Sequence, residues 1–116
     1  MIDKRGLQTQ QGTATTSDGV IGTEVPSNMR RYIYKIKTAN QYDGANQLEL
    51  GYSDDDGATH TTLDYIEHAT QYEMWDDPDA LKEDALPLYI IPAGNKIYVK
   101  TDNGDVECYF EYEDSE

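Results

Sequence analysis

The run Asp54-Asp55-Asp56-Gly57 places three carboxylates side by side, and carboxylate oxygens are the ligands that calcium prefers. The helix-loop-helix calcium motif is excluded, because its conserved Gly and Glu positions fall on Thr59 and Tyr65 when counted from Asp54. A cation site made from Asp54, Asp56 and backbone carbonyls is one hypothesis. The alternative is a solvated hairpin turn, which the Asp-Gly pair favours.

A second acidic group, Asp76, Asp77 and Asp79, surrounds Pro78 and raises the same cation hypothesis, with helix capping by Asp76 or Asp77 as the favoured alternative. Asp caps helix N-termini and Pro is tolerated in a first helical turn, so this group predicts the start of a short helical turn at 80–83. That turn would lie within a long connection over residues 67–86, which lacks clean alternation of apolar residues.

The remaining reactive residues lack the spacing that catalysis needs. His60 and His68 have no cysteine or HExxH frame near them, which predicts surface or cross-strand histidines rather than a zinc site. Cys108 alternates with Val106 and Phe110, which predicts a buried structural thiol. Hydrolase and nucleotide-binding signatures are absent, and among 23 acidic residues carboxylate pairs arise by chance. We therefore predict a protein that is not an enzyme and has no cofactor.

The charge balance restricts the class of partner. Nine basic and 23 acidic residues give a net charge of −14, which disfavours binding to nucleic acid and to anionic membranes. Asp outnumbers Glu by 14 to 9, a pattern similar to that of proteins from salt-loving archaea. The alternative is an ordinary acidic protein whose charge maintains its solubility. The sequence also lacks an apolar run of the roughly 20 residues that a transmembrane helix needs, and a secretory signal is not expected.

Alternating apolar residues and turn signals predict a single all-β domain over residues 20–116. We expect about seven short strands, which favours a β-sandwich similar to a jelly roll. An oligonucleotide-binding barrel has a comparable strand number, but the charge disfavours its usual ligand. The expected strands cover residues 20–25, 31–37, 48–52, 59–65, 86–91, 96–101 and 106–112.

In one of these strands and in the last hairpin, the alternation also predicts which side chains share a face. In 31–37, alternation places Tyr32, Tyr34 and Ile36 on one face, and Arg31, Ile33, Lys35 and Lys37 on the other. In the last hairpin, the expected inward residues are Ile97, Val99, Val106, Cys108, Phe110 and Tyr112, with Glu107, Tyr109 and Glu111 facing out.

Residues 1–19 show neither a helical nor a two-residue apolar period, which predicts an extended polar arm outside the β domain. Residues 6–17 carry no charge, although the chain is strongly acidic, so we expect the arm to become ordered on a neighbouring subunit. The alternative is a floppy terminus. The arm residues expected to contact a partner are Gln8, Gln10, Gln11, Thr13, Thr15 and Thr16.

Ten tyrosines supply most of the aromatic surface. Tyr32, Tyr34, Tyr52 and Tyr89 are expected in the core, and Tyr42, Tyr72, Tyr98 and Tyr109 on the surface. Exposed aromatic rings between acidic residues are typical of protein interfaces, which assigns Tyr98 and Tyr109 to partner binding. A carbohydrate site that uses the same rings is the competing hypothesis.

The layout resembles that of small β-sandwich decoration, or cement, proteins of tailed-virus capsids. The resemblance depends on the polar arm, the Arg30-Arg31-Tyr32-Ile33-Tyr34 strand and the hairpin of residues 88–99, which contains Ile91-Pro92-Ala93-Gly94-Asn95. It implies a non-enzymatic virion protein, often trimeric, that binds the major capsid protein or sister subunits at the capsid surface. An acidic form would fit a virus of a halophilic archaeon.

Two other functional classes stay open. One is a small β-sandwich module that binds carbohydrate or calcium. The other is an acidic inhibitor that mimics DNA and blocks a basic protein.

The net charge predicts that salt stabilises the fold. The screening length falls to about 3 Å at 1 M salt, so repulsion among like charges should weaken while the apolar core is unaffected. We expect the midpoint of thermal unfolding to rise between about 0.05 and about 3 M potassium chloride. A flat or falling midpoint would contradict the halophilic interpretation.

Overall fold

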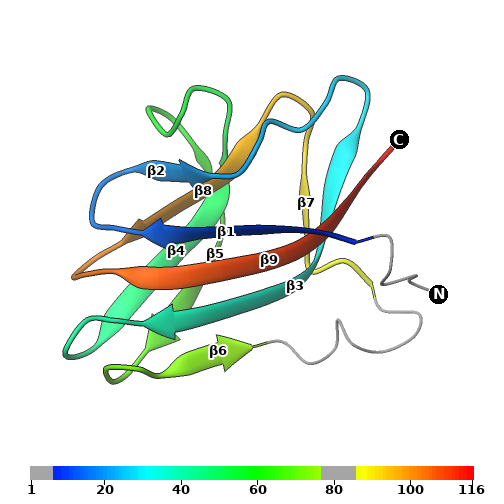
Figure 1. Cartoon of the computed structure of the whole chain (residues 1–116). Coiled ribbons are helices and arrows are strands. Elements are labelled where there is room, and N and C mark those ends of the chain that lie inside the picture. Colours follow the sequence, from blue (N-terminus) through cyan, green and yellow to red (C-terminus); the bar gives the residue numbers. More distant parts are fainter. Residues whose placement is uncertain (1–6, 77–85) are drawn as a thin grey trace.

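The computed structural model describes residues 7–76 and 86–116, which form nine β-strands (Figure 1). The strands are β1 (Gln8–Ala14), β2 (Gly19–Ile21), β3 (Arg30–Asn40), β4 (Asn46–Ser53), β5 (Thr61–His68), β6 (Met74–Asp76), β7 (Tyr89–Ile91), β8 (Lys96–Thr101) and β9 (Val106–Ser115). The prediction of an all-β fold is confirmed. No described residue belongs to a helix that could cross a membrane.

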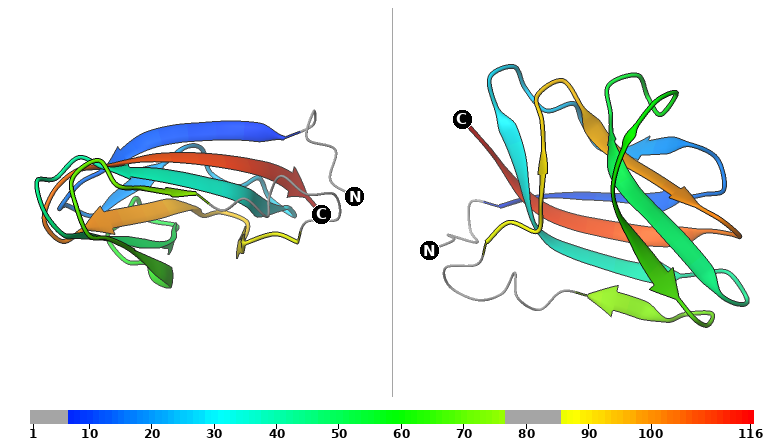
Figure 2. Two further views of the ribbon diagram at one scale, coloured as in Figure 1. Left: turned by 90° about the horizontal axis from the view of Figure 1, so that it is seen from below. Right: turned by 180° about the vertical axis from the view of Figure 1, so that it is seen from behind.

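The strands pair into two antiparallel sheets that pack as a sandwich (Figure 2, left). Sheet A has the order β1-β9-β3-β6, and β7 also pairs with β3. Sheet B has the order β2-β8-β4-β5. One edge of sheet A is therefore β1 and the other is formed by β6 and β7, whereas β2 and β5 are the edges of sheet B.

Apolar side chains from both inner faces fill the space between the sheets. The inward residues predicted for the last hairpin, from Ile97 on β8 to Tyr112 on β9, are all buried. Cys108 is among them, which confirms the prediction that its thiol is buried, and this burial raises the pKa of the thiol to about 12. The other large members of this core are Ile21, Val25, Ile33, Ile36, Leu48, Leu50, Ile66 and Ile91.

The predicted faces of β3 are wrong because the strand contains a bulge. Its register against β9 shifts between Ile33 and Lys35, so one residue has no partner of its own. An extra residue reverses the alternation beyond that point. Ile33 and Ile36 therefore both point into the core, although the sequence pattern placed them on opposite faces. Tyr34 lies at the bulge and is also buried.

The segment predicted as an arm forms an edge strand along residues 8–14. These residues are extended, as predicted, but they pair with β9 from Gln8 opposite Tyr112 to Ala14 opposite Val106. Ala14 is fully buried. The inward positions of β1 between these ends are Gln10 and Gly12, so the sequence has no apolar alternation to signal a strand. Residues 8–14 are therefore part of sheet A, which corrects the prediction that they lie outside the β domain.

The expected long connection at 67–86 also contains strand structure. Strand β5 continues to His68, and β6 pairs with β3 through Ala39 opposite Met74. The short helical turn expected at 80–83 lies outside the described residues.

A buried ion pair joins the start of β3 to the end of β9. Arg31 is 1% exposed, and its Nε and Nη2 donate to the two carboxylate oxygens of Asp114 at 2.8 and 2.9 Å. Its Nη1 donates to the carbonyl of Thr23 at 2.7 Å, and its guanidinium carbon lies 4.2 Å from the ring centroid of Tyr112. Each nitrogen of the guanidinium thus donates a hydrogen bond, and the positive charge is paired with a carboxylate. A buried charge is tolerated only under these conditions.

We expect Asp114→Asn to destabilise the fold by about 3 kcal/mol, because it leaves a buried guanidinium without its ionic partner. Urea titration measures the free energy of unfolding. Glu113→Gln is the matched control, since it removes the same charge from an exposed neighbour and should cost under about 0.5 kcal/mol. Both changes reduce the net negative charge, so equal effects would contradict a specific role for the ion pair.

Candidate functional site

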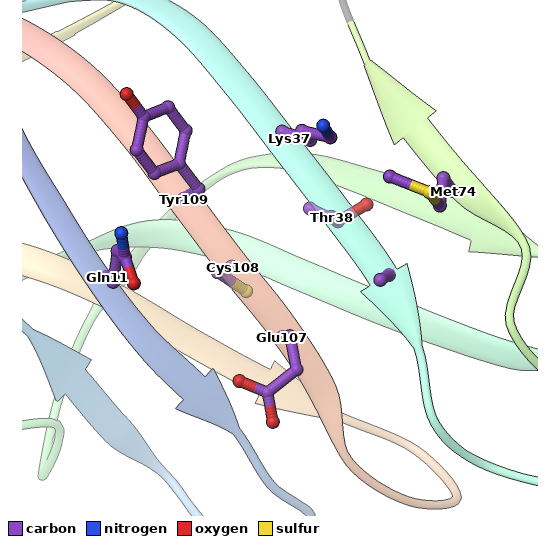
Figure 3. Close-up of a pocket in the computed structure, with 8 residues that line it drawn as sticks. Gln11, Lys37, Thr38, Met74, Glu107, Cys108 and Tyr109 are labelled. Carbon is purple, nitrogen blue, oxygen red and sulfur yellow. The ribbon is translucent and has the colours of Figure 1, made fainter.

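The outer face of sheet A carries a shallow hollow that spans all four strands of the main sheet order (Figure 3). Strand register forms one row of Gln11, Tyr109 and Lys37, and a second row that includes Ala39 and Met74. Ala39 offers only a methyl group between longer neighbours, so the surface dips there. The hollow has a volume of about 280 Å³ and is lined by Gln11, Lys37, Thr38, Ala39, Met74, Glu107, Cys108 and Tyr109.

The groups around this hollow differ in exposure and in hydrogen bonding. The Tyr109 hydroxyl donates to Glu111 at 2.8 Å, and burial together with this hydrogen bond raises the pKa of the phenol. The Cys108 thiol points into the core. Lys37 and Met74 are exposed, the latter by 57%. Among the lining residues, therefore, an aromatic ring, a thioether and an ammonium face solvent without an activated nucleophile.

Strand β1 forms the border of this face and pairs on one side only within the described residues. Its seven residues, Gln8–Ala14, carry no charge. Half of the backbone N–H and C=O groups of such an edge strand point away from their neighbour and can bind another strand. Lys or Pro on the strand is a common protection against such pairing, and β1 has neither.

The structure brings together three of the residues predicted to contact a partner. Gln11, Thr13 and Tyr109 share the outer face of sheet A, since Gln11 lies opposite Tyr109 in the register. Thr13 donates to the carboxylate of Glu107 at 3.0 Å to the nearer oxygen. These residues and the free edge of β1 form one continuous surface, which we call the β1 surface.

The other predicted arm residues lie elsewhere. Gln8 and Gln10 are on the inner side of β1, where the Gln10 amide donates to the Tyr112 hydroxyl at 3.0 Å. Thr15 and Thr16 belong to the exposed turn after β1. That turn is held to β8, because the Thr15 carbonyl accepts from the Thr101 amide at 2.8 Å.

Tyr98 is buried, which corrects its predicted exposure. It lies on the outer face of sheet B, but its ring is covered by His60, with centroids 3.8 Å apart and planes 5° apart. Its hydroxyl donates to Asp18. Burial raises the pKa of Tyr98, and the same hydrogen bond lowers that of Asp18. The alternation of β8 places Tyr98 on the outer face correctly. It does not reveal that His60, from the turn after β4, covers the ring.

The two histidines occupy different environments and are far from forming a metal centre. The Nε2 atom of His60 lies 2.8 Å from a Glu49 oxygen at the surface. His68 is buried, and its Nε2 lies 2.8 Å from the Thr38 hydroxyl, so the contact links β5 of sheet B to β3 of sheet A. In the part of the chain that the structure describes, no three His, Cys, Asp or Glu side chains gather as metal ligands.

The acidic run forms the turn between β4 and β5, as one of the two hypotheses predicted. Asp56 and Gly57 have φ of 58° and 98°, the left-handed region that an Asp-Gly pair tolerates. The Asp55 carboxylate accepts from the amide and hydroxyl of Thr59 at 2.9 and 2.6 Å, and from the Ser53 hydroxyl at 2.7 Å. Asp56, a candidate ligand of the cation hypothesis, instead lies 2.8 Å from the Lys96 ammonium.

The sequence did not signal three residues of the hollow: Lys37, Met74 and Ala39. No pattern in the sequence indicates that Met74 lies opposite Ala39, two residues along β3 from Lys37. The three-residue strand β6 is too short for a period, and its partner β3 lies more than thirty residues earlier in the printed sequence. A hollow formed by register between distant strands leaves no local sequence signal.

We expect Asp55→Asn to lower the midpoint of thermal unfolding near neutral pH, whereas Asp54→Asn, an exposed neighbour, should leave it nearly unchanged. Hydrogen bonds, those from Thr59 first, lower the pKa of Asp55 from 3.8 to about 2. The carboxylate therefore contributes stability above the ordinary pKa, and this contribution is lost as pH falls through the folded value. The difference between parent and Asp55→Asn should vanish near that lower pH.

Melts with and without calcium complete this test. Calcium-dependent stabilisation that disappears in Asp54→Asn and Asp56→Asn would support the cation hypothesis over the turn.

Comparisons with models of known protein families, with curated protein sequences and with solved structures found no match to this chain. The function is therefore inferred from the β1 surface and from the chemistry of the described residues.

Proposed function

We propose that this protein is a non-enzymatic structural component that stabilises a larger assembly through its β1 surface. The observation that carries the proposal is the uncharged free edge of β1 in a chain of net charge −14. Acidic side chains at this edge would protect a monomer from pairing at no cost in solubility. Their absence along all seven residues favours an edge that meets a partner.

The state of the reactive groups supports a structural role. The Cys108 thiol is buried with a raised pKa, so little nucleophilic thiolate forms at neutral pH. The Asp55 carboxylate is occupied by the hydrogen bonds of its own turn. His68 is enclosed between the sheets, away from any substrate at the surface.

The proposed assembly is a viral capsid, where the chain acts as a decoration protein bound to the major capsid protein or to sister subunits. The shape of the described part supports this, because extents of 40 × 32 × 18 Å make a flat plate with a large face for its mass. A plate that adds strands at its edge can tie neighbouring subunits together on a lattice. The location of the protein would then be the virion surface, in a halophilic host if salt stabilises it.

A small carbohydrate-binding module is the second candidate, and one observation favours it. Tyr65 is 53% exposed on the outer face of sheet B, beside Gln47, Glu49 and Lys100. A ring among hydrogen-bonding groups can stack on a sugar. However, the hollow there has a volume of about 110 Å³, below the several hundred Å³ of typical ligand sites.

We expect the protein to be a stoichiometric part of purified particles of the virus that encodes it, and to rebind particles from which it has been stripped. Thr9→Lys on the free edge should weaken rebinding about tenfold, because a lysine on an edge strand opposes strand addition. Thr62→Lys is the matched control on the edge strand of sheet B and should rebind normally. Quantitative mass spectrometry and sedimentation with particles measure both.

Absence from the particles would contradict the proposal. Saturable stabilisation of the monomer by a sugar, lost in Tyr65→Ala, would favour the second candidate instead.

A further inference from the structure

We infer that β1 pairs with β1 of a second copy of this chain, antiparallel and about a two-fold axis at Gln11. The two copies of sheet A then become one continuous sheet across the dimer. This inference rests on the proposed function, since it names a partner of the same β1 surface, but self-association is measured separately from binding to a particle.

The sequence of β1 is complementary to itself in this register. Gln11 lies opposite Gln11 of the second copy, and Thr9 lies opposite Thr13. Opposed threonines can hydrogen-bond across strands, and opposed like charges, which would destabilise the pair, do not occur. The remaining opposed pairs of this register are Gln10 with Gly12 and Gln8 with Ala14.

The same register keeps the inner and outer faces of the two copies continuous. Gln10, Gly12 and Ala14 share the inner side with the buried residues of β9, and Gln11 and Thr13 share the outer side. Each opposed pair combines two residues of the same side, as an isologous two-fold contact requires. The side chain of Ile21 fills the space on the inner side of Gly12, because a Cβ there would lie only 2.9 Å from Ile21 Cγ1.

The distribution of charge permits this contact despite the net repulsion between copies. The acidic residues nearest to the edge on the outer face, Glu107 and Glu111, belong to β9, one strand behind β1. In the joined sheet, the two β9 strands are three strand spacings apart, about 14 Å. That separation exceeds the Debye length of about 10 Å at 0.1 M salt and greatly exceeds the value of about 3 Å at 1 M. Self-pairing should therefore strengthen with ionic strength.

The other edges in the described ranges are less suited to such pairing. Strands β2, β6 and β7 have three residues each. Strand β5 is longer, but it carries Asp64 and Glu67 and contains an irregularity opposite Leu50 and Gly51. Charged residues and bulges are the usual protections of an edge strand. β1 is thus the longest uncharged edge of the described structure.

Engineered cysteines test the contact and its register. Gln11→Cys should form a disulfide-linked dimer on mild oxidation, because opposed Cα atoms lie about 4.5–5.5 Å apart in either type of antiparallel pair. Thr9→Cys alone should not, since the two copies of residue 9 would be four residues, about 13 Å, apart along the strands. The double variant Thr9→Cys with Thr13→Cys should link again. Cys108 is buried and should not interfere.

Lysine variants test the free energy of the contact without a crosslink. Sedimentation equilibrium at rising protein concentration, in about 0.1 and about 3 M potassium chloride, should show a monomer-dimer equilibrium that salt strengthens. Gln11→Lys should weaken it about fivefold or more, because the two lysines face each other across the axis. Gln41→Lys, on the exposed turn after β3, makes the same change in net charge and should have no such effect.

The outcomes decide the inference in both directions. A monomer in the high-salt samples, equal effects of the two lysine variants, or crosslinking by Thr9→Cys as efficient as by Gln11→Cys would overturn it. Any of these results, combined with normal binding to particles, would contradict the dimer and leave the proposed structural function supported. Dimerisation without binding to particles would support the dimer and contradict the proposed function.

Discussion

The long antiparallel ladder between β3 and β9 is the constraint on which the rest of the structure depends. It runs from Arg30 opposite Ser115 to Asn40 opposite Val106, and every other strand of sheet A is attached to one of these two. The bulge between Ile33 and Lys35 divides the ladder, so that the first part of β3 can also pair with β7 while the last part pairs with β6. The buried contact of Arg31 with Asp114 fixes the register of the first part. A slip of one residue there would move the Asp114 side chain to the opposite face of the sheet, away from the guanidinium.

Buried asparagines close the opposite end of the ladder. The Asn40 amide donates to the carbonyls of Gly44 and Thr70 at 3.0 and 2.8 Å, and its oxygen accepts from Asn46 at 3.0 Å. Asn46 in turn donates to the Gly104 carbonyl at 2.9 Å. Two fully buried amides thus hold the connections that follow β3, β5 and β8 in one place. Because the outer rows of sheet A start from this end, the asparagines also position Ala39 and the hollow around it.

The sequence predicted the parts of this fold that local alternation encodes. The last hairpin shows this most clearly, since its two-residue period identified the apolar inward side chains from Ile97 to Tyr112, although the prediction did not include Thr101, which is buried as well. Alternation failed where an extra residue entered at Tyr34 and where β1 buried small or polar residues instead of apolar ones. The burial of Tyr98 by His60, and that of Arg31 by Asp114, depend on residues about 40 and 83 positions away. Contacts of that range are fixed by register and topology, which a single sequence does not display.

The β1 surface likewise has one feature that the sequence displays and one that only register and topology determine. The unusual feature of residues 6–17, the lack of charge in a strongly acidic chain, was visible in the sequence and indicated contact with a partner. What the sequence could not give was the form of that contact, since a polar segment can be a mobile arm or a strand. Pairing with β9 holds β1 extended, so in the proposed dimer a second strand would add to it without the full cost of ordering a flexible chain, about 1–2 kcal/mol for each residue. On the outer face of the described residues, the acidic side chains nearest to this edge lie one strand behind it, on β9. In the proposed assembly, this arrangement would leave the neutral edge of β1 as the place where copies can pair, while the charges on the rest of the surface oppose other contacts.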